Sequence, residues 1–442
     1  MPPAVLAPQD RSFLKAFFQA VTDQALEPDD PRYVPLYEGD AALPDDPVEL
    51  LARAIEFSEE QSVQLLSGFR GIGKTTELLR LQARLRREGY KVMYIDMLGF
   101  VNTAAPIDVT DFLMALGGAV GESLKAPELL GENPARRGYW DRLVDFLIKT
   151  NINVGDMTAA GLKVNLRSDP SFLEQIQKRM QGHLGALVTD VWKFVAECVA
   201  ALKQRHGHET QVVLLIDSLE KMRGSYQNAR QVQESVETLF AHHAEKLRLP
   251  DVHVVYTVPP YLKARSLGIG MLYGLGAVPV FPAIKVRGSK GDLHPSGLSA
   301  MRKVVEKRGD WARLLGRQEL VDRLILMSGG NLRDLLRLFA EVIRRAKTLP
   351  VSEEVVEMAI NQMRAEFLPI ANTDASWLAT IAATHEAALM NMEQVPDLAR
   401  FFDSHVVLCY RNGPEWYDVH PLIREHVIKQ AEALKTRSED DE

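Results

Sequence analysis

The stretch Gly68-Phe69-Arg70-Gly71-Ile72-Gly73-Lys74-Thr75 is the most informative part of the 442-residue chain. It fits the pattern G-x-x-x-x-G-K-[ST] at every fixed position. Glycines let the backbone bend so that successive N–H groups point at one anion, and the helix that follows adds the positive end of its dipole. We expect Lys74 to reach the β- and γ-phosphates of a nucleotide and the Thr75 hydroxyl to bind Mg²⁺. Thr76 completes the predicted phosphate-binding segment.

The segments on either side of this loop have the pattern that the motif requires. Residues 63–67 form an apolar run typical of a buried strand, and residues 75–88 have helical periodicity that ends at Gly89. Further β-branched runs occur at residues 91–96, 212–216, 252–258 and 278–281. Strands buried on both faces of a parallel sheet have this composition. The sequence therefore predicts an α/β fold with a doubly wound parallel sheet, the P-loop NTPase core.

Polar side chains lie at the ends of two of these apolar runs. Asp217 follows residues 212–216, so the carboxyl edge of the sheet would place it beside the phosphates, where a carboxylate can bind Mg²⁺. Many ATPases have a glutamate next, which polarises the attacking water, but this chain has Ser218. Glu220 is the nearest alternative base, or else a solvated acid at a helix start. Thr257 either contacts the attacking water or simply ends its strand.

A basic helix is predicted to begin within Gly329-Gly330-Asn331-Leu332-Arg333. An arginine in the first turn of a helical domain packed over the sheet can reach the nucleotide as a planar donor, and Arg333 is the candidate. Surface ion pairing is the alternative for this side chain. Arg265 could act on the nucleotide of a neighbouring subunit, but we favour an ordinary surface role for it.

The length of 442 residues indicates more than one domain. We expect an N-terminal extension at 1–47 and a P-loop ATPase core at 48–290. A largely helical insertion at about 100–205 interrupts this core, and its residues 152–166 alternate as in a small hairpin. An all-α lid is expected at 291–370. Helices and a hairpin, signalled by Asn412-Gly413, predict a winged-helix domain with an acidic tail at 371–442.

The composition argues against several classes of protein. Cys198 and Cys409 are the only cysteines, so we expect neither a disulfide framework nor a thiolate metal cluster. The apolar runs are far shorter than the ~20 residues that span a bilayer, and the first ten residues lack the pattern of a secretory signal. The paired histidines at 206/208 and 242/243 lack a third ligand at zinc-like spacing. We therefore expect a cytoplasmic protein that does not bind a membrane.

The net charge of -7 at pH 7 is unevenly distributed. Acidic residues dominate residues 1–60 and the C-terminal tail, whereas basic residues outnumber acidic ones in residues 301–350. A basic segment in an acidic chain is either a surface for a polyanion or an ordinary charged helical face. We favour the second interpretation.

The order of these motifs resembles that of the AAA+ ATPases of the origin-recognition type and the related STAND signalling ATPases, from roughly residue 48 to the end. Both families combine a P-loop core, a helical lid and a C-terminal winged helix. The resemblance implies that residues 68–75 are the Walker A motif, Asp217 the Walker B aspartate, Thr257 sensor 1 and Arg333 sensor 2. Ser218 is closer to the STAND pattern, in which slow hydrolysis times a switch. Adenine contacts are implied for Tyr33, Val34 and Pro35.

Three functions fit this sequence. The first is a molecular switch. Binding of ATP and Mg²⁺ closes the lid and alters the contacts with a partner protein or another copy of the chain, and slow hydrolysis of ATP to ADP resets the switch. The resemblance implies a bacterial regulatory module, such as one for antiviral defence. The second is a DNA-binding initiator or loader, although the helix at 395–403 and the wing offer few basic residues beyond Arg400 and Arg411. The third is a scaffold that holds nucleotide without hydrolysing it.

Overall fold

The structure is a computed structural model, and it describes residues 6–38, 45–132, 138–150, 158–225, 227–274, 276, 278–411 and 413–440. The chain divides into two compact units. The first comprises Met1–Pro47, Phe69–Glu77 and Phe281–Glu442, and the second comprises Val48–Gly68 and Leu78–Val280. The phosphate-binding loop therefore belongs to the unit that holds both chain termini, although the strand that leads into it belongs to the other.

A parallel sheet is the centre of the second unit. Its strand order is β2-β3-β4-β1-β5, formed by β2 Lys91–Asp96, β3 Val212–Asp217, β4 His253–Val258, β1 Ser62–Gly68 and β5 Val280–Phe281. The pairs β1–β4, β2–β3 and β3–β4 are all parallel. Every side chain of β3 and β4 is buried, which explains why these strands read as unbroken apolar runs. The predicted α/β fold with a parallel sheet is confirmed.

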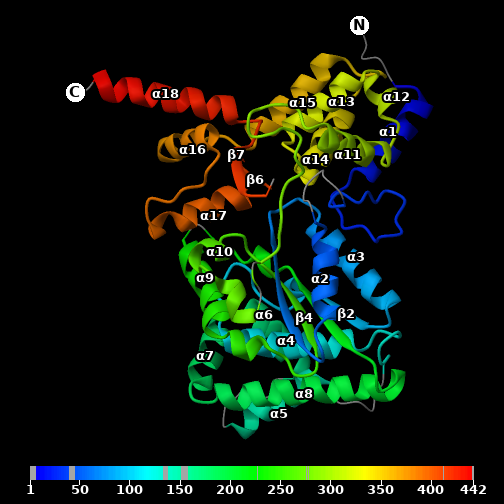
Figure 1. The fold of residues 1–442 in the computed structure, drawn as a ribbon, viewed down its shortest axis with the longest axis vertical. Coiled ribbons are helices and arrows are strands. Elements are labelled where there is room, and N and C mark those ends of the chain that lie inside the picture. Colours follow the sequence, from blue (N-terminus) through cyan, green and yellow to red (C-terminus); the bar gives the residue numbers. More distant parts are fainter. Residues whose placement is uncertain are drawn as a thin grey trace. The chain divides into compact units, whose positions relative to one another are not determined.

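The second unit also contains α-helices, of which α4 packs on the sheet. They are α2 Pro47–Glu56, α3 Lys74–Arg87, α4 Val109–Ser123, α5 Tyr139–Lys149, α6 Ala159–Ser168, α7 Pro170–Met180, α8 Leu184–His206, α9 Ala229–Glu237 and α10 Leu262–Arg265. The apolar helix α4 packs against β2 and against α5, α6, α7 and α8 (Figure 1). The described part of the segment between β2 and β3 contains five α-helices joined by turns and loops; its description as an insertion stays a prediction.

One detail of this segment differs from the sequence prediction. Residues 152–166 were predicted to form a hairpin, but the part from Ala159 onward is helix α6, while residues 152–157 lie outside the described residues. Thr158 caps this helix by accepting a hydrogen bond from the Gly161 amide. The helices α7 and α8 are separated at Gly182, which adopts a positive φ of 88°.

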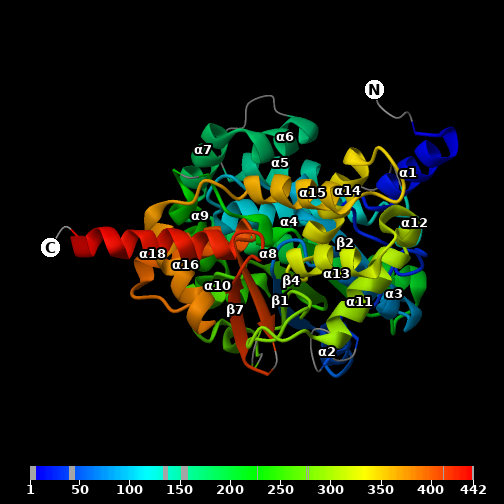
Figure 2. The same cartoon turned by 90° about the horizontal axis from the view of Figure 1, so that it is seen from above.

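The first unit contains a group of helices around α14 Leu332–Arg345. Figure 2 shows it with its neighbours α11 Pro295–Glu306, α13 Gln318–Met327 and α15 Glu353–Ala365; the short α12 Trp311–Leu315 precedes α13. The N-terminal helix α1 Pro8–Ala20 also packs on α14, where Phe17 lies 6.1 Å from Phe339 between ring centroids. Both aromatic rings are buried, so the N-terminal extension forms part of this hydrophobic core.

The C-terminal segment of the first unit consists of helices and a hairpin. Its elements are α16 Asn372–Thr384, α17 Val395–Asp403, β6 Val407–Arg411, β7 Glu415–Val419 and α18 Arg424–Asp440. The strands pair antiparallel, and Asn412 of the predicted turn lies outside the described residues. The predicted order of helices and hairpin is present, and its identification as a winged helix stays a prediction. Among the described helices, none is both long enough and apolar enough to cross a membrane.

A buried cluster joins α14 to the C-terminal segment. The Asp334 carboxylate is fully buried, and its Oδ2 lies 2.8 Å from His405 Nδ1 and 3.5 Å from His420 Nε2. Nearby, the Tyr410 hydroxyl donates to the Gly329 carbonyl oxygen at 2.6 Å. Buried polar groups without partners are costly, so this cluster ties α14 to the start of β6.

Asp111 in α4 predicts a pH dependence for the second unit. Burial raises its pKa to about 7, even though Gln177 Nε2 donates to its Oδ2 at 2.5 Å. The folded protein therefore favours the protonated form of Asp111. The stability that this form provides is fully present below about pH 4, the pKa of the carboxyl group in the unfolded chain, and is lost as pH rises towards 7. We expect the wild type to lose roughly 4 kcal/mol of unfolding free energy between pH 4 and 8.

Asp111→Asn should remove this dependence, as measured by urea unfolding at several pH values. The matched control is Asp141→Asn on the exposed side of α5, which should keep the pH profile of the wild type. Parallel profiles for wild type and Asp111→Asn would contradict the assignment.

Candidate nucleotide site

The phosphate-binding loop adopts the bent backbone that its glycines were predicted to allow. Gly71 and Gly73 have φ values of +78° and +92°, in the region that side chains other than glycine rarely adopt. Gly68 ends β1, and Lys74 begins α3. The Lys74 side chain is buried and its Nζ donates to the Phe69 carbonyl oxygen at 3.3 Å. This geometry turns the loop around the amino end of α3, the arrangement that suits a phosphate.

The beginning of α14 is hydrogen-bonded to this loop. Asn331 caps the helix, with its Oδ1 accepting from the Asp334 amide at 3.2 Å. Its Nδ2 donates to the Arg70 carbonyl oxygen at 2.9 Å, and the Arg333 amide donates to the Gly71 carbonyl oxygen at 2.9 Å. One backbone N–H group in the first turn of α14, that of Arg333, therefore finds its hydrogen-bond acceptor on the loop.

The N-terminal segment contacts the same loop from three positions. The Tyr37 hydroxyl donates to the Ile72 carbonyl oxygen at 3.0 Å, and the Leu26 amide donates to the Thr76 hydroxyl at 3.2 Å. The Tyr33 hydroxyl donates to Glu77 Oε1 at 3.3 Å. Of the predicted adenine contacts Tyr33, Val34 and Pro35, the first thus lies against the amino end of α3.

The C-terminal segment also reaches the loop. The ring of Phe69 packs edge-on against Phe402 of α17, with 4.9 Å between centroids. Both side chains are buried. A movement of the loop at Phe69 would therefore disturb the packing of α17, because close-packed aromatic pairs leave little free volume.

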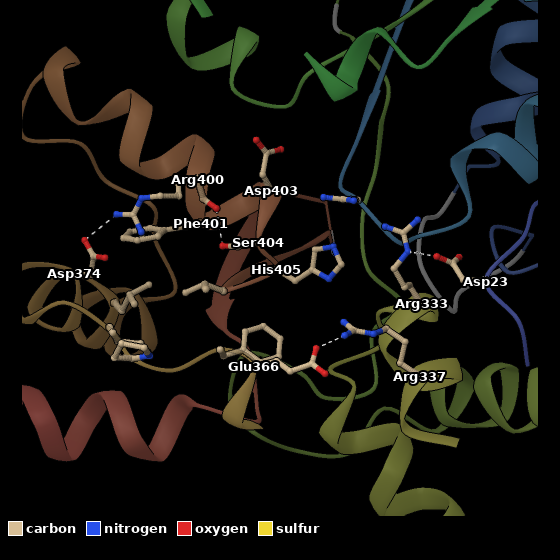
Figure 3. Close-up of a pocket in the computed structure, with 16 residues that line it drawn as sticks. Asp23, Arg333, Arg337, Glu366, Asp374, Arg400, Phe401, Asp403, Ser404 and His405 are labelled. Atoms are coloured by element: carbon tan, nitrogen blue, oxygen red, sulfur yellow. Dashed lines mark hydrogen bonds and ion pairs between the residues drawn. The ribbon is translucent and has the colours of Figure 1, made fainter. Parts of the chain in front are cut away.

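The side chain of Arg333 forms an ion pair with Asp23 of the N-terminal segment. It lies beside a cavity in the first unit (Figure 3). In the second unit, Arg265 pairs with Glu237 at 2.7 Å and lies 3.9 Å from Glu234. Arg333 therefore contacts the loop through its backbone amide, and Arg265 lies in a largely buried ion-pair network rather than in the surface role expected from the sequence.

Asp217, the predicted Walker B aspartate, ends β3 in the second unit and is fully buried. Its Oδ2 accepts a hydrogen bond from the Tyr94 hydroxyl at 2.7 Å, and its Oδ1 accepts from the Ser218 amide at 2.7 Å. Burial, together with this carboxylate, raises the pKa of Tyr94 well above its usual value, so the phenol keeps its proton and fixes Asp217.

The residues after Asp217 form a tight turn. Ser218 has a φ of +73°, an uncommon conformation for a residue with a side chain. Lys221 Nζ donates to its hydroxyl at 2.9 Å, and Thr257 Oγ1 accepts from the Leu219 amide at 3.2 Å. Thr257 therefore holds the turn that carries the half-buried Glu220. Strained backbone of this kind is concentrated at functional sites.

The predicted site residues fall into two groups. Phe69 to Thr76 and Arg333 come together in the first unit, whereas Asp217, Glu220 and Thr257 come together in the second. The sequence interpretation missed several residues that contact these groups: Asp23, Tyr37, Tyr94, Asn331 and Phe402. Only Asn331 had a local signal, since an asparagine before a periodic helix is a typical cap. Within the described residues, no group of three or more His, Cys, Asp and Glu side chains is placed to hold a metal ion.

Comparisons with known proteins give remote structural similarities. No protein-family model matches the chain, and no curated protein matches it. The ADP form of the Aeropyrum pernix ORC2 protein is 13% identical with a TM-score of 0.44, covering 94% of this chain and 97% of that chain. A Walker-type ATPase of Pyrococcus abyssi is 12% identical with a TM-score of 0.40, covering 89% and 100%. The A. pernix ORC1 protein in complex with DNA is 14% identical with a TM-score of 0.33, covering 88% and 91%.

Proposed function

We propose that this chain is an ATP-binding P-loop ATPase of the AAA+ kind, in which nucleotide occupancy controls the helical and C-terminal parts of the first unit. The observation that carries the proposal is the set of contacts on the phosphate-binding loop. Segments from the N-terminus, α14 and α17 all contact residues 69–77. A nucleotide that moved this loop would therefore act on three segments that are remote from it in sequence.

The roles within the proposed site follow from the chemistry of each group. Lys74 is the candidate cation for the β- and γ-phosphates, and the Thr75 hydroxyl is a hard oxygen of the kind that suits Mg²⁺. The same role for the Asp217 carboxylate stays a prediction from the sequence. When bound, Mg²⁺ would neutralise charge on the phosphates. Glu220 is the candidate base for the attacking water, and Thr257 holds the turn that presents it.

Arg333 is the candidate link between nucleotide and helices. Its backbone is already hydrogen-bonded to Gly71, while its guanidinium pairs with the half-exposed Asp23. Ion pairs that contact water contribute little stability, and a γ-phosphate is a more highly charged, bidentate partner. Exchange of Asp23 for phosphate would move the N-terminal segment, which gives a physical form to the proposed switch.

Nucleotide titration of Lys74→Ala tests the binding proposal. Loss of a charged hydrogen-bond donor to phosphate should weaken ATP binding at least about tenfold, measured with a fluorescent ATP analogue and Mg²⁺. Lys91→Ala is the control, because this lysine begins β2 away from the loop. Equal affinities for wild type and Lys74→Ala would contradict the phosphate-binding assignment.

Single-turnover hydrolysis tests the catalytic assignment. Glu220→Gln should bind ATP like the wild type and hydrolyse it at least about tenfold more slowly, because general bases contribute 10²–10⁴-fold in typical enzymes. Normal turnover by this variant would show that the base lies elsewhere. Slowly released nucleotide without turnover in the wild type would favour the scaffold hypothesis.

DNA binding by the C-terminal segment is the second candidate, favoured by the exposed side chain of Arg400 on α17. Against it, Arg400 lies 3.0 Å from both Asp374 and Asp397, which reduces its attraction for phosphate. DNA binding that falls steeply with salt and disappears in an Arg400→Ala, Arg411→Ala double variant would support this candidate. The role in a regulatory or defence module stays a prediction from the sequence resemblance.

A further inference from the structure

Three successive carbonyl oxygens of the phosphate-binding loop, those of Arg70, Gly71 and Ile72, accept hydrogen bonds from other segments of the first unit. Asn331 Nδ2 donates to the first and the Arg333 amide to the second, each at 2.9 Å. Both donors belong to the first turn of α14. The third oxygen has its donor in the N-terminal segment. Two segments that are remote from the loop in sequence therefore hold consecutive peptide groups of it.

The Tyr37 side chain supplies the third hydrogen bond. Its hydroxyl lies 3.0 Å from the Ile72 carbonyl oxygen and 2.9 Å from that of Pro282, so its single proton serves two acceptors. The side chain is 1% exposed, and its ring packs edge-on against Phe281 with 4.6 Å between centroids. Burial raises the pKa of Tyr37 well above its ordinary value, and the charge of Glu77 raises it further. The phenol therefore remains a hydrogen-bond donor in a fixed place.

The direction of each carbonyl group fixes the direction of the N–H group that follows it. In a trans peptide the C=O and N–H bonds lie in one plane and point in opposite directions. Because the Ile72 carbonyl points to Tyr37, the Gly73 amide points away from Tyr37. Gly71 and Gly73 have φ values of +78° and +92°, and successive amides in such bends form a concave site for one anion. The hydrogen bonds on the carbonyl oxygens thus orient the amides that a phosphate would contact.

We propose that Tyr37 is a positioning residue of the phosphate-binding loop, whose hydroxyl holds the Ile72–Gly73 peptide with its N–H group towards a bound phosphate. This inference rests on the proposed function, because it requires the loop to bind nucleotide phosphate. Tyr37 acts through the backbone of the loop and needs no contact of its own with the ligand. Without the hydroxyl this peptide can rotate, and a phosphate must then restore its orientation at a cost in affinity.

Tyr37→Phe removes the hydroxyl and keeps the buried ring. The full-length chain is titrated with fluorescent N-methylanthraniloyl-ADP and Mg²⁺, with inorganic pyrophosphate as the competitor. We expect Tyr37→Phe to weaken the binding of both ligands by about fivefold, the effect of one lost hydrogen bond. Tyr273→Phe is the matched control and should bind both ligands like the wild type. Tyr273 is also buried, and its hydroxyl donates to the Phe240 carbonyl oxygen at 2.7 Å in the second unit.

Nuclear magnetic resonance of the wild type tests the orientation of the peptide without any substitution. Labelling isoleucine carbonyl carbons with ¹³C and glycine nitrogens with ¹⁵N selects Ile–Gly peptides, of which the chain has two, Ile72-Gly73 and Ile269-Gly270. We expect pyrophosphate to shift the Gly73 amide proton downfield, as a hydrogen bond to phosphate does, and to leave that of Gly270 in place. A Gly73 signal that does not move would overturn the proposal.

The titrations provide two further ways to overturn it. Pyrophosphate has no base, so a loss of affinity confined to the labelled nucleotide would place the effect of Tyr37 at the base instead of the phosphates. Unchanged affinities for both ligands, in a variant that thermal unfolding shows to be folded, would remove any role for the hydroxyl. Failure of the proposed function is distinct, because wild type and Lys74→Ala would then bind the labelled nucleotide equally.

Discussion

Asp334→Ala is expected to lower the unfolding free energy of the first unit by about 2–4 kcal/mol, because it removes a buried, hydrogen-bonded carboxylate and leaves buried imidazole groups without an acceptor. Asp334 is completely buried and accepts a hydrogen bond from His405 at 2.8 Å, with His420 at 3.5 Å. Arg337 lies 3.5 Å from its other carboxylate oxygen. Alanine would leave two buried imidazoles without this acceptor. Urea unfolding, with hydrogen exchange of peptides from β6 and α14, measures the loss.

The pH dependence of this loss has a definite sign. Burial by itself would raise the pKa of Asp334, but the hydrogen bond from His405 and the nearby ring of His420 outweigh it and hold the pKa well below its usual range. A depressed carboxyl pKa contributes stability that is complete above the unfolded value of about 4 and is lost as pH falls through the folded value. The stability difference between wild type and Asp334→Asn should therefore narrow below about pH 4.

Asp322→Ala provides the matched control for this prediction. Asp322 lies on the neighbouring helix α13 and pairs with Arg302 at 2.5 Å, but both side chains are partly exposed. Water screens such a pair, so its removal should cost about 1 kcal/mol or less. Equal losses for Asp334→Ala and Asp322→Ala would show that the buried cluster does not hold the C-terminal segment.

The sheet could be predicted from the sequence because its signals are local. The runs that became β3 and β4 are buried on both faces, so each strand is apolar regardless of its neighbours. The turn that begins with Gly71 was predictable for the same reason, since the loop motif is contiguous. Helix α6 was missed because the alternation of apolar and polar residues was taken as the sign of a strand. Two better signals were present: Thr158 can cap a helix, and the buried Leu162 and Leu166 are four residues apart, as on one face of a helix.

The contacts on the loop could not be predicted, because their partners are remote in sequence. Asn331 reaches Arg70 across 261 positions, and Arg333 reaches Asp23 across 310. A single sequence carries no signal for such pairs. The charge of α17 could be read in part from the sequence, which shows few basic residues there, but the pairing of Arg400 with the remote Asp374 could not. The motif order suggests a switch, and the first unit's internal contacts indicate which segments it would move.

Gly71→Ala is expected to weaken nucleotide binding by about a hundredfold. Backbone strain at residue 71 and displacement of the loop from α14 together cost about 3 kcal/mol. Gly71 has a φ of +78°, where a Cβ atom is strained. That Cβ would also lie 2.6 Å from Asn331 Oδ1 and 2.9 Å from Arg333 Cβ. Either the loop or the first turn of α14 must move, and both hold the proposed site. Titration with the fluorescent ATP analogue measures the effect.

Gly89→Ala is the control that introduces backbone strain without a steric clash with another segment. Gly89 has a φ of +95°, but no atom lies within 4 Å of the Cβ that alanine would add. This variant should lose about 1 kcal/mol of stability and bind nucleotide like the wild type. If Gly71→Ala binds ATP no more weakly than Gly89→Ala does, the contact of α14 with the loop has no role in nucleotide binding. Binding lost only in Gly71→Ala would instead make the packing of Asn331 and Arg333 on Gly71 part of the nucleotide site.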